Sequence, residues 1–198
     1  MQQPWQIKGK SWSKGGLLMR IERNDAIAIV VDYQEKLMPV ILDNETVVKN
    51  SEILINGLRE LEVPFIVSQQ YTKGLGETVA PIANALNDVK YFEKKSFSLW
   101  QSEEIKEAII ASGKKTAIIC GVEAHICVLQ TVIDLRDAGY NVVLVADCIG
   151  SRKKIDKRFA LKRAVEEGAF LTTHEAILYE LTIGADSPHF KIISKLTK

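Results

Sequence analysis

Near the middle of the chain, Lys115-Thr116-Ala117-Ile118-Ile119-Cys120 is followed directly by Gly121-Val122-Glu123-Ala124-His125-Ile126-Cys127-Val128. The first run is apolar and β-branched, which is typical of a buried strand, and the second opens a helical pattern. A helix N-terminus carries unpaired N–H groups and about half a positive charge, which favours a thiolate over a thiol. We therefore expect Cys127 to line a crevice and to carry the chemistry of this protein.

Two other cysteines and two charged residues bear on this interpretation. Free cysteine is usually a small buried hydrophobic residue, and Cys120 and Cys148 stand in apolar runs that fit this role. Asp32 ends a fully apolar strand pattern, and Lys94 follows a short third one. Taken singly, such an aspartate is as often a helix cap as a catalyst, and most lysines are solvated. Only the combination with Cys127 indicates a site.

Strand and helix patterns alternate from residue 25 onward, with helical spacing clearest over residues 44–62 and after Cys127. Strands that alternate with helices indicate one parallel sheet covered on both faces, because right-handed crossovers place the helices there. The carboxyl ends of such strands face the ligand crevice. The six strand patterns lie near residues 26–31, 63–68, 89–93, 115–120, 141–146 and 168–172.

The composition indicates a cytoplasmic enzyme of one large domain. The chain has 198 residues, a formal net charge of +1 and three cysteines without a CxxC pair. A balanced charge gives no electrostatic reason to expect nucleic acid as a partner, and the odd cysteine count favours a reducing compartment over a disulfide framework. No apolar stretch reaches the ~20 residues that a membrane helix needs. We expect a small-molecule substrate, no nucleic acid and no membrane.

Residues 1–18 differ from the rest and form an N-terminal extension before a folded domain over 19–198. They hold three lysines, two tryptophans and no acidic residue. A targeting presequence is one interpretation, but the segment is poor in serine and lacks arginine. We favour an extension that packs on a neighbouring subunit, or an upstream start with Met19 as the usual initiator.

The three segments around Asp32, Lys94 and Cys127, in this order, resemble the isochorismatase-like cysteine hydrolases, a family that includes nicotinamidases and N-carbamoylsarcosine amidases. The resemblance runs from about Asp25 to the C-terminus. The chain looks most like the isochorismatase domain-containing subgroup, whose substrates are poorly defined. The segments that carry this likeness are Gln69–Thr78, Ala146–Arg152 and Phe190–Leu196.

The resemblance implies a three-layer α/β/α sandwich of Rossmann-like type, with a six-stranded parallel sheet in the order 3-2-1-4-5-6. That order would bring Asp32 and Cys127 together where the strand order reverses, with Lys94 reaching in after the third strand. The family pattern K-x-x-[FY]-[SG] selects Lys94 over Lys95 through Phe97 and Ser98. Family members usually assemble, so a homo-oligomer, dimer or larger, is implied as well.

The resemblance also implies a mechanism, in which Asp32, Lys94 and Cys127 form a catalytic triad that cleaves a small amide or ureido C–N bond through a thioester. Asp32 would accept and return the proton, and Lys94 would stabilise the charges. Family members have a cis peptide at the position of Val122–Glu123. The backbone N–H groups of Glu123 and Cys127 would form the oxyanion hole.

Metal and cofactor chemistry of the nicotinamidase type is not expected. Nicotinamidases carry an Asp-x-His and further histidines between their first two strands, and this chain lacks them. Its three histidines, His125, His174 and His189, have no ligand-like spacing to another histidine or cysteine. We therefore expect no cofactor and no metal at the site.

The sequence identifies neither the substrate nor whether the triad is catalytically active. Gln34, Tyr71, Phe97 and Trp100 are candidates to line the pocket, although aromatic residues at such positions are as often core. One alternative is a binding or assembly protein that keeps the fold without meaningful turnover. The other is a vinyl-ether hydrolase of the isochorismatase type, whose chemistry does not require a thiol.

Overall fold

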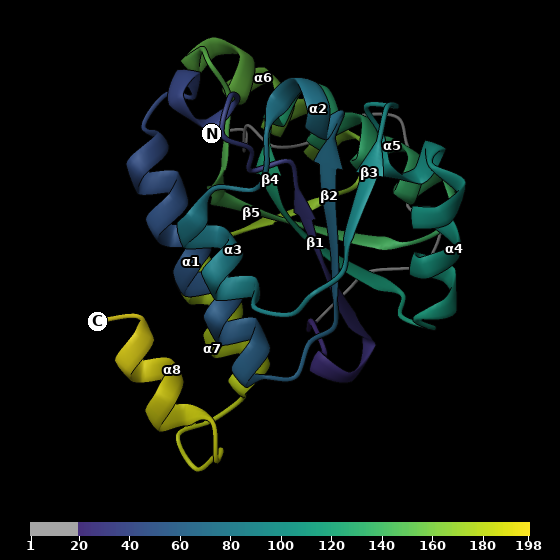
Figure 1. The fold of residues 1–198 in the computed structure, drawn as a ribbon. Coiled ribbons are helices and arrows are strands. Elements are labelled where there is room, and N and C mark those ends of the chain that lie inside the picture. Colours follow the sequence, from purple (N-terminus) through teal and green to yellow (C-terminus); the bar gives the residue numbers. More distant parts are fainter. Residues whose placement is uncertain (1–19) are drawn as a thin grey trace, which may run out of the picture.

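A computed structural model describes residues 20–198 of the chain. Its centre is a six-stranded parallel sheet in the order β3-β2-β1-β4-β5-β6, so the predicted fold and strand order are confirmed (Figure 1). The predicted extension 1–18 lies outside the described residues. The strands are β1 (Ala26–Val31), β2 (Phe65–Gln70), β3 (Tyr91–Lys94), β4 (Thr116–Val122), β5 (Asn141–Gly150) and β6 (Phe170–Thr172).

Helices cover both faces of the sheet and bury a separate apolar layer on each. One layer lies beneath α1, α3, α7 and α8, and the other beneath α4, α5 and α6 (Figure 1). Every residue of β1 is buried, as expected of a central parallel strand. The helices are α1 (Asn44–Glu60), α2 (Thr72–Leu75), α3 (Ala80–Leu86), α4 (Glu103–Ala111), α5 (Leu129–Asp137), α6 (Lys154–Glu166), α7 (His174–Thr182) and α8 (Phe190–Leu196).

Four single turns complete the connections. Three are 3₁₀ turns, and the fourth is a π-helical turn that runs directly into α5. The π-helical turn is the segment that carries Cys127. The turns are η1 (Arg23–Asp25), η2 (Met38–Val40), η3 (Leu99–Gln101) and η4 (Ala124–Val128).

The backbones of β1 and β4, the strands between which the strand order reverses, leave no room for a side chain at Gly121. Val31 pairs with Gly121, whose φ is +134°. A Cβ at this glycine would clash with the Val31 carbonyl oxygen, which is backbone and cannot swing away. Glycine is therefore required here, both for its backbone angle and for the space. It brings the two strand ends that carry Asp32 and Cys127 close together.

Only β1 keeps its predicted limits, and for two of the other strands the reason for the difference is identifiable. β2 begins at Phe65 rather than at Val63, because Pro64 has no N–H to donate to a ladder. β5 extends to Gly150 and loses its regular register beside β4. None of the described helices is long and apolar enough to cross a membrane.

The irregular part of β5 has a direct structural consequence. Gly121 of β4 pairs with Ile149, where continuation of the preceding register would place Ala146. The additional residues form a bulge in β5, and Asp147 and Cys148 lie in it. Side chains of successive residues in a regular strand point to opposite faces, and a bulge removes that constraint.

Candidate functional site

Asp32 follows β1 and is fully buried at the carboxyl edge of the sheet. Its backbone is left-handed, with φ at +51°, an uncommon conformation that aspartate tolerates better than most residues. The Ser68 hydroxyl donates to Oδ1 over 2.7 Å, and the Lys94 ammonium donates to Oδ2 over 2.7 Å. Both carboxylate oxygens are therefore held in fixed positions.

Lys94 is the last residue of β3, and its side chain is completely buried. Besides Asp32, its Nζ donates to Gln70 Oε1 over 2.6 Å and to the Ser96 carbonyl oxygen over 3.3 Å. Lys95, its neighbour in the chain, is exposed. The structure thus places Lys94, and not Lys95, against the aspartate, as the motif spacing predicts.

A buried ion pair of this kind is costly to break. Removing one partner leaves an uncompensated charge in a low dielectric, which typically costs about 3–5 kcal/mol. The pair is a poor choice for stability alone, because apolar residues of similar volume often stabilise a core as well or better. Its presence at a strand-end crevice, where ligands bind in open α/β sheets, is what makes it a functional candidate.

Cys127 lies in the π-helical turn η4, at the sheet edge that carries Asp32. Its residue is only 6% exposed and belongs to the apolar layer beneath α4, α5 and α6. The expected surface thiol is therefore a largely buried one. π-helical turns occur frequently at functional sites.

The protonation of Cys127 differs from the sequence-based expectation. Burial raises the pKa of the Cys127 thiol to about 12, the Asp32 carboxylate raises it as well, and Lys94 opposes the change. The expected thiolate at the helix start is therefore not favoured in the resting protein, and desolvation of the thiol is the largest cause. At neutral pH the thiol is protonated, and Asp32 is positioned to receive its proton.

Glu123 joins β4 to the π-helical turn. The peptide bond between Val122 and Glu123 is cis, and the Glu123 carbonyl oxygen accepts from the N–H groups of Ile126 and Val128. The Glu123 carboxylate accepts from Nε and from the backbone N–H of Arg152, over 3.0 and 3.1 Å. The Glu123 side chain is therefore engaged with Arg152, and the backbone N–H of Glu123 is the group that the predicted scheme uses.

The four candidate pocket residues do not share one environment. Gln34 is fully buried, and its amide exchanges hydrogen bonds with the Gln70 backbone and donates to the Gly76 carbonyl oxygen. Trp100 is half-buried and packs edge-on against Tyr140. Such contacts give Gln34 and Trp100 structural roles.

Tyr71 and Phe97 have exposed side chains, at 48% and 53%. Tyr71 follows β2 and Phe97 follows β3, so both lie in loops at the carboxyl edge of the sheet. Exposed aromatic rings in that position are available to a ligand. They stay candidates for substrate contact.

His125 is adjacent to the site in sequence but engaged elsewhere. Its Nδ1 lies 3.0 Å from Ser151 Oγ, and its Nε2 lies 3.9 Å from an Asp156 carboxylate oxygen. These contacts engage both ring nitrogens of His125 with residues outside the Asp32–Lys94–Cys127 group. His125 is held toward α6.

Sequence reasoning missed two residues that hold the site together, Ser68 and Gln70. Both belong to β2, which pairs with β1 on one side and β3 on the other. Val31 pairs with Ser68 and Gln70 pairs with Lys94, so each side chain lies beside the group that it orients. Only the sheet register reveals them, because neither residue type is distinctive in the sequence.

One group of metal-ligating residues is present among residues 20–198, and it lies away from this site. It consists of Asp147, Cys148 and His174. The spacing of the histidines along the sequence gives no sign of this group, because His174 is far along the chain from the two residues that it meets.

The comparison with known proteins agrees with this architecture. The family model described as "Isochorismatase domain" matches residues 26–176, most of the chain. The protein belongs to the isochorismatase family, and the resemblance noted from its sequence is confirmed.

Individual relatives cover nearly the whole chain. The secreted isochorismatase effector Isc1 of Phytophthora sojae is 35% identical and covers 91% of this chain and 88% of its own. Isochorismatase domain-containing protein 2 of Xenopus laevis is 34% identical, covering 89% and 85%. The solved structure titled MAR1 ribonuclease from Caenorhabditis elegans is 38% identical with a TM-score of 0.85, covering 89% and 91%.

Proposed function

We propose that this protein is a cysteine hydrolase that cleaves a small amide or ureido C–N bond through a thioester. The observation that carries the proposal is the fully buried contact of 2.7 Å between Lys94 Nζ and Asp32 Oδ2, whose charges both act on the Cys127 thiol. A nucleophile, a base and a fixed cation are the three groups that such a reaction requires.

In the acylation step, Cys127 Sγ attacks the carbonyl carbon of the substrate while Asp32 takes the thiol proton. The carbonyl π electrons move to oxygen, and the backbone N–H groups of Glu123 and Cys127 stabilise the resulting oxyanion; such a donor is worth about 10² to 10³ in rate. The oxyanion then collapses, the C–N bond breaks, and Asp32 gives the proton to the departing nitrogen. A thioester and an amine or ammonia result.

In the deacylation step, water attacks the thioester carbon and Asp32 takes a proton from it. Collapse of the second oxyanion breaks the C–S bond, and the proton returns to Cys127. The product is a carboxylic or carbamic acid. Lys94 holds the Asp32 carboxyl group in place through its hydrogen bond and offsets the negative charge that develops on sulfur.

The raised pKa of the Cys127 thiol shapes this scheme, because almost no thiolate exists at neutral pH before substrate binds. Proton transfer to Asp32 must therefore accompany the attack on carbon. The same observation favours the alternative function, a binding or assembly protein in which the buried thiol is inert. A vinyl-ether hydrolase is a further alternative, and its reaction leaves Cys127 without a covalent role.

The assembly and location of the protein belong to the same proposal. We propose a homo-oligomer, because exposed apolar side chains, among them Val40, Leu42, Ile155 and Phe159, stand on the surface of the described chain. A cytoplasmic location follows from three cysteines that form no disulfide with one another. The Phytophthora sojae relative is named as secreted, so location requires its own measurement by fractionation.

The proposal is tested by a hydrolysis screen of the full chain with a panel of primary amides, carbamoyl compounds, esters and vinyl ethers. RNA belongs in the panel because the Caenorhabditis elegans protein is titled a ribonuclease. We expect turnover of an amide or carbamoyl compound that Cys127→Ala abolishes and Cys120→Ala retains, since Cys120 is a buried thiol outside the triad. Turnover that survives Cys127→Ala, or hydrolysis of RNA alone, would contradict the proposal.

A further inference from the structure

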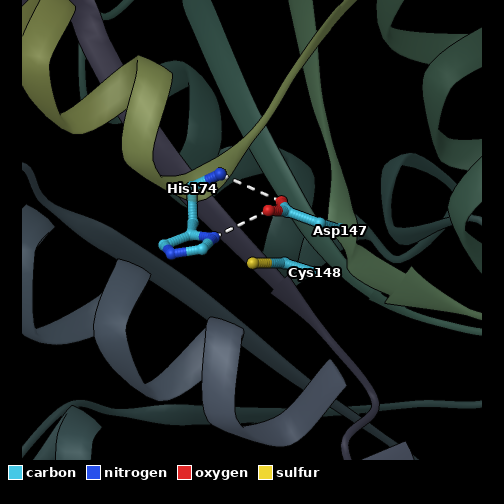
Figure 2. Close-up of side chains that lie close together, drawn as sticks. All are labelled: Asp147, Cys148 and His174. Atoms are coloured by element: carbon cyan, nitrogen blue, oxygen red, sulfur yellow. Dashed lines mark hydrogen bonds and ion pairs between the residues drawn. The ribbon is translucent and has the colours of Figure 1, made fainter. Parts of the chain in front are cut away.

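A second group of reactive side chains lies on the other side of the sheet from Cys127. Asp147 and Cys148 come from the bulge of β5, and His174 is the first residue of α7. Figure 2 shows the Asp147 carboxylate, the Cys148 sulfur and the His174 ring converging on one point. Cys148 belongs to the apolar layer beneath α1 and α7, whereas Cys127 belongs to the opposite layer.

The atoms of this cluster are close enough to share a ligand. His174 Nδ1 lies 2.7 Å from Asp147 Oδ2, and one ligand atom from each of the three residues lies within 4.8 Å of the others. The other carboxylate oxygen, Oδ1, accepts from the His174 backbone N–H over 2.9 Å and so caps α7. Oδ2 can therefore bind a ligand while Oδ1 keeps the helix in place.

We propose that Asp147, Cys148 and His174 form a zinc site, with Oδ2, Sγ and Nδ1 as ligands and water in the fourth position. Thiolate and imidazole together select a borderline metal such as Zn²⁺ and disfavour Mg²⁺ and Ca²⁺, which prefer oxygen. With Zn–N near 2.0 Å and Zn–S near 2.3 Å, tetrahedral ligand atoms lie about 3.3–3.6 Å apart. The longest of these distances, at most 4.8 Å, would shorten by up to about 1.5 Å, and the 2.7 Å contact between His174 and Asp147 would lengthen by about 0.6–0.9 Å.

Burial and charge fit such a site. Cys148 is fully buried, whereas the His174 and Asp147 side chains are 17% and 27% exposed, which leaves access for the metal and for water. The Lys157 charge acts on both Asp147 and Cys148. A carboxylate and a thiolate neutralise Zn²⁺, so the loaded site adds no net positive charge beside this lysine.

Zn²⁺ binding requires only the release of one proton, and it would link β5 to α7. The Cys148 thiol loses its proton to solvent, the neutral His174 ring carries its proton on Nε2, and no group is oxidised or reduced. The metal would connect β5 to α7, and no part of the proposed catalytic scheme passes through it. If the zinc proposal fails, the proposed role of Cys127 is unaffected.

The test is titration of the chelator-treated full chain with ZnCl₂ in competition with a chromophoric chelator. We expect one Zn²⁺ per chain. Cys148→Ser and His174→Gln should each weaken binding at least about tenfold, since even outer-shell partners of a metal cost that much. Cys120→Ala and His125→Gln are matched controls that should bind as the wild type does. With Co²⁺ in place of Zn²⁺, a thiolate-to-metal absorption band should appear in wild type and Cys120→Ala but not in Cys148→Ser.

Three outcomes would overturn the proposal. These are a wild-type chain that does not bind Zn²⁺, binding that His174→Gln and Cys148→Ser leave unchanged, and a Co²⁺ complex without the thiolate band. Because His174 is partly exposed, His174→Gln provides the decisive variant even if the buried Cys148→Ser fails to fold.

Discussion

Lys94 and Lys95 are neighbours in the chain and stand in opposite environments, one completely buried on Asp32 and the other exposed. At the scale of the residue, this difference was predictable, because a motif and the alternation of an extended segment both select Lys94. Ser68 and Gln70, which orient Asp32 and Lys94, were not predictable. Their role depends on which strands pair, and that is a property of the sheet.

The two lysines therefore offer a matched comparison of stability that needs no substrate. Lys94→Met should lower the free energy of unfolding by about 3–5 kcal/mol, because it leaves the buried Asp32 carboxylate unpaired. Lys95→Met should change it by less than about 0.5 kcal/mol, as at most surface positions. Urea denaturation at pH 7 measures both.

A double variant separates the ion pair from simple loss of packing. Asp32→Asn combined with Lys94→Met leaves neither charge buried, so it should be more stable than Lys94→Met alone. If Lys95→Met proves the more destabilising of the two single variants, the assignment of the buried cation is wrong.

At the scale of the element, the alternation of strand and helix patterns predicted six parallel strands, and the family resemblance supplied their order. Neither predicted the local irregularities. The bulge of β5 places Asp147 and Cys148 together, and the π-helical turn η4 places Cys127 in an apolar layer. Neither irregularity has a signature in residue type. The sequence thus located the candidate nucleophile at the strand end but misjudged its exposure and its protonation.

Gly121 allows β1 and β4 to approach each other beside the site. Gly121→Ala should therefore destabilise the protein by about 2–4 kcal/mol. Its left-handed backbone strains any other residue, and a Cβ would also clash with the Val31 carbonyl oxygen. Gly113→Ala is the matched control, because Gly113 has φ at +67° with no atom within 4 Å of an added Cβ. It should cost only about 1–2 kcal/mol of backbone strain.

Chemical denaturation of the two glycine variants measures this difference. Equal losses of stability would show that the close approach of β1 to β4 contributes nothing beyond the backbone angle. A smaller loss in Gly121→Ala than in Gly113→Ala would contradict the packing of the sheet centre.

At the scale of the whole molecule, the buried thiols of Cys120 and Cys127 predict how stability depends on pH. Burial raises the pKa of Cys120 and of Cys127 from 9.0 to about 12. The unfolded chain releases these protons near pH 9, but the folded chain holds them until about pH 12. Their contribution to stability is therefore complete below pH 9 and is lost progressively as the pH rises toward 12.

The free energy of unfolding should fall above pH 9 by up to about 1.4 kcal/mol per pH unit for each thiol. Urea denaturation at a series of alkaline pH values measures the slope. Cys120→Ala, although less stable overall, should show a shallower slope than wild type. An unchanged slope in that variant would mean that Cys120 does not titrate as its burial requires.

The central claim is that Cys127 forms a thioester with the substrate, and intact-mass spectrometry of an acid-quenched reaction tests it most directly. With the best amide or carbamoyl compound from the screen, we predict an adduct with the mass of the acyl group. It should map to the peptide that contains Cys127 and be absent from Cys127→Ala. An adduct on Cys120 or Cys148 instead, or steady turnover without an acylated Cys127 at any quench time, would contradict the account.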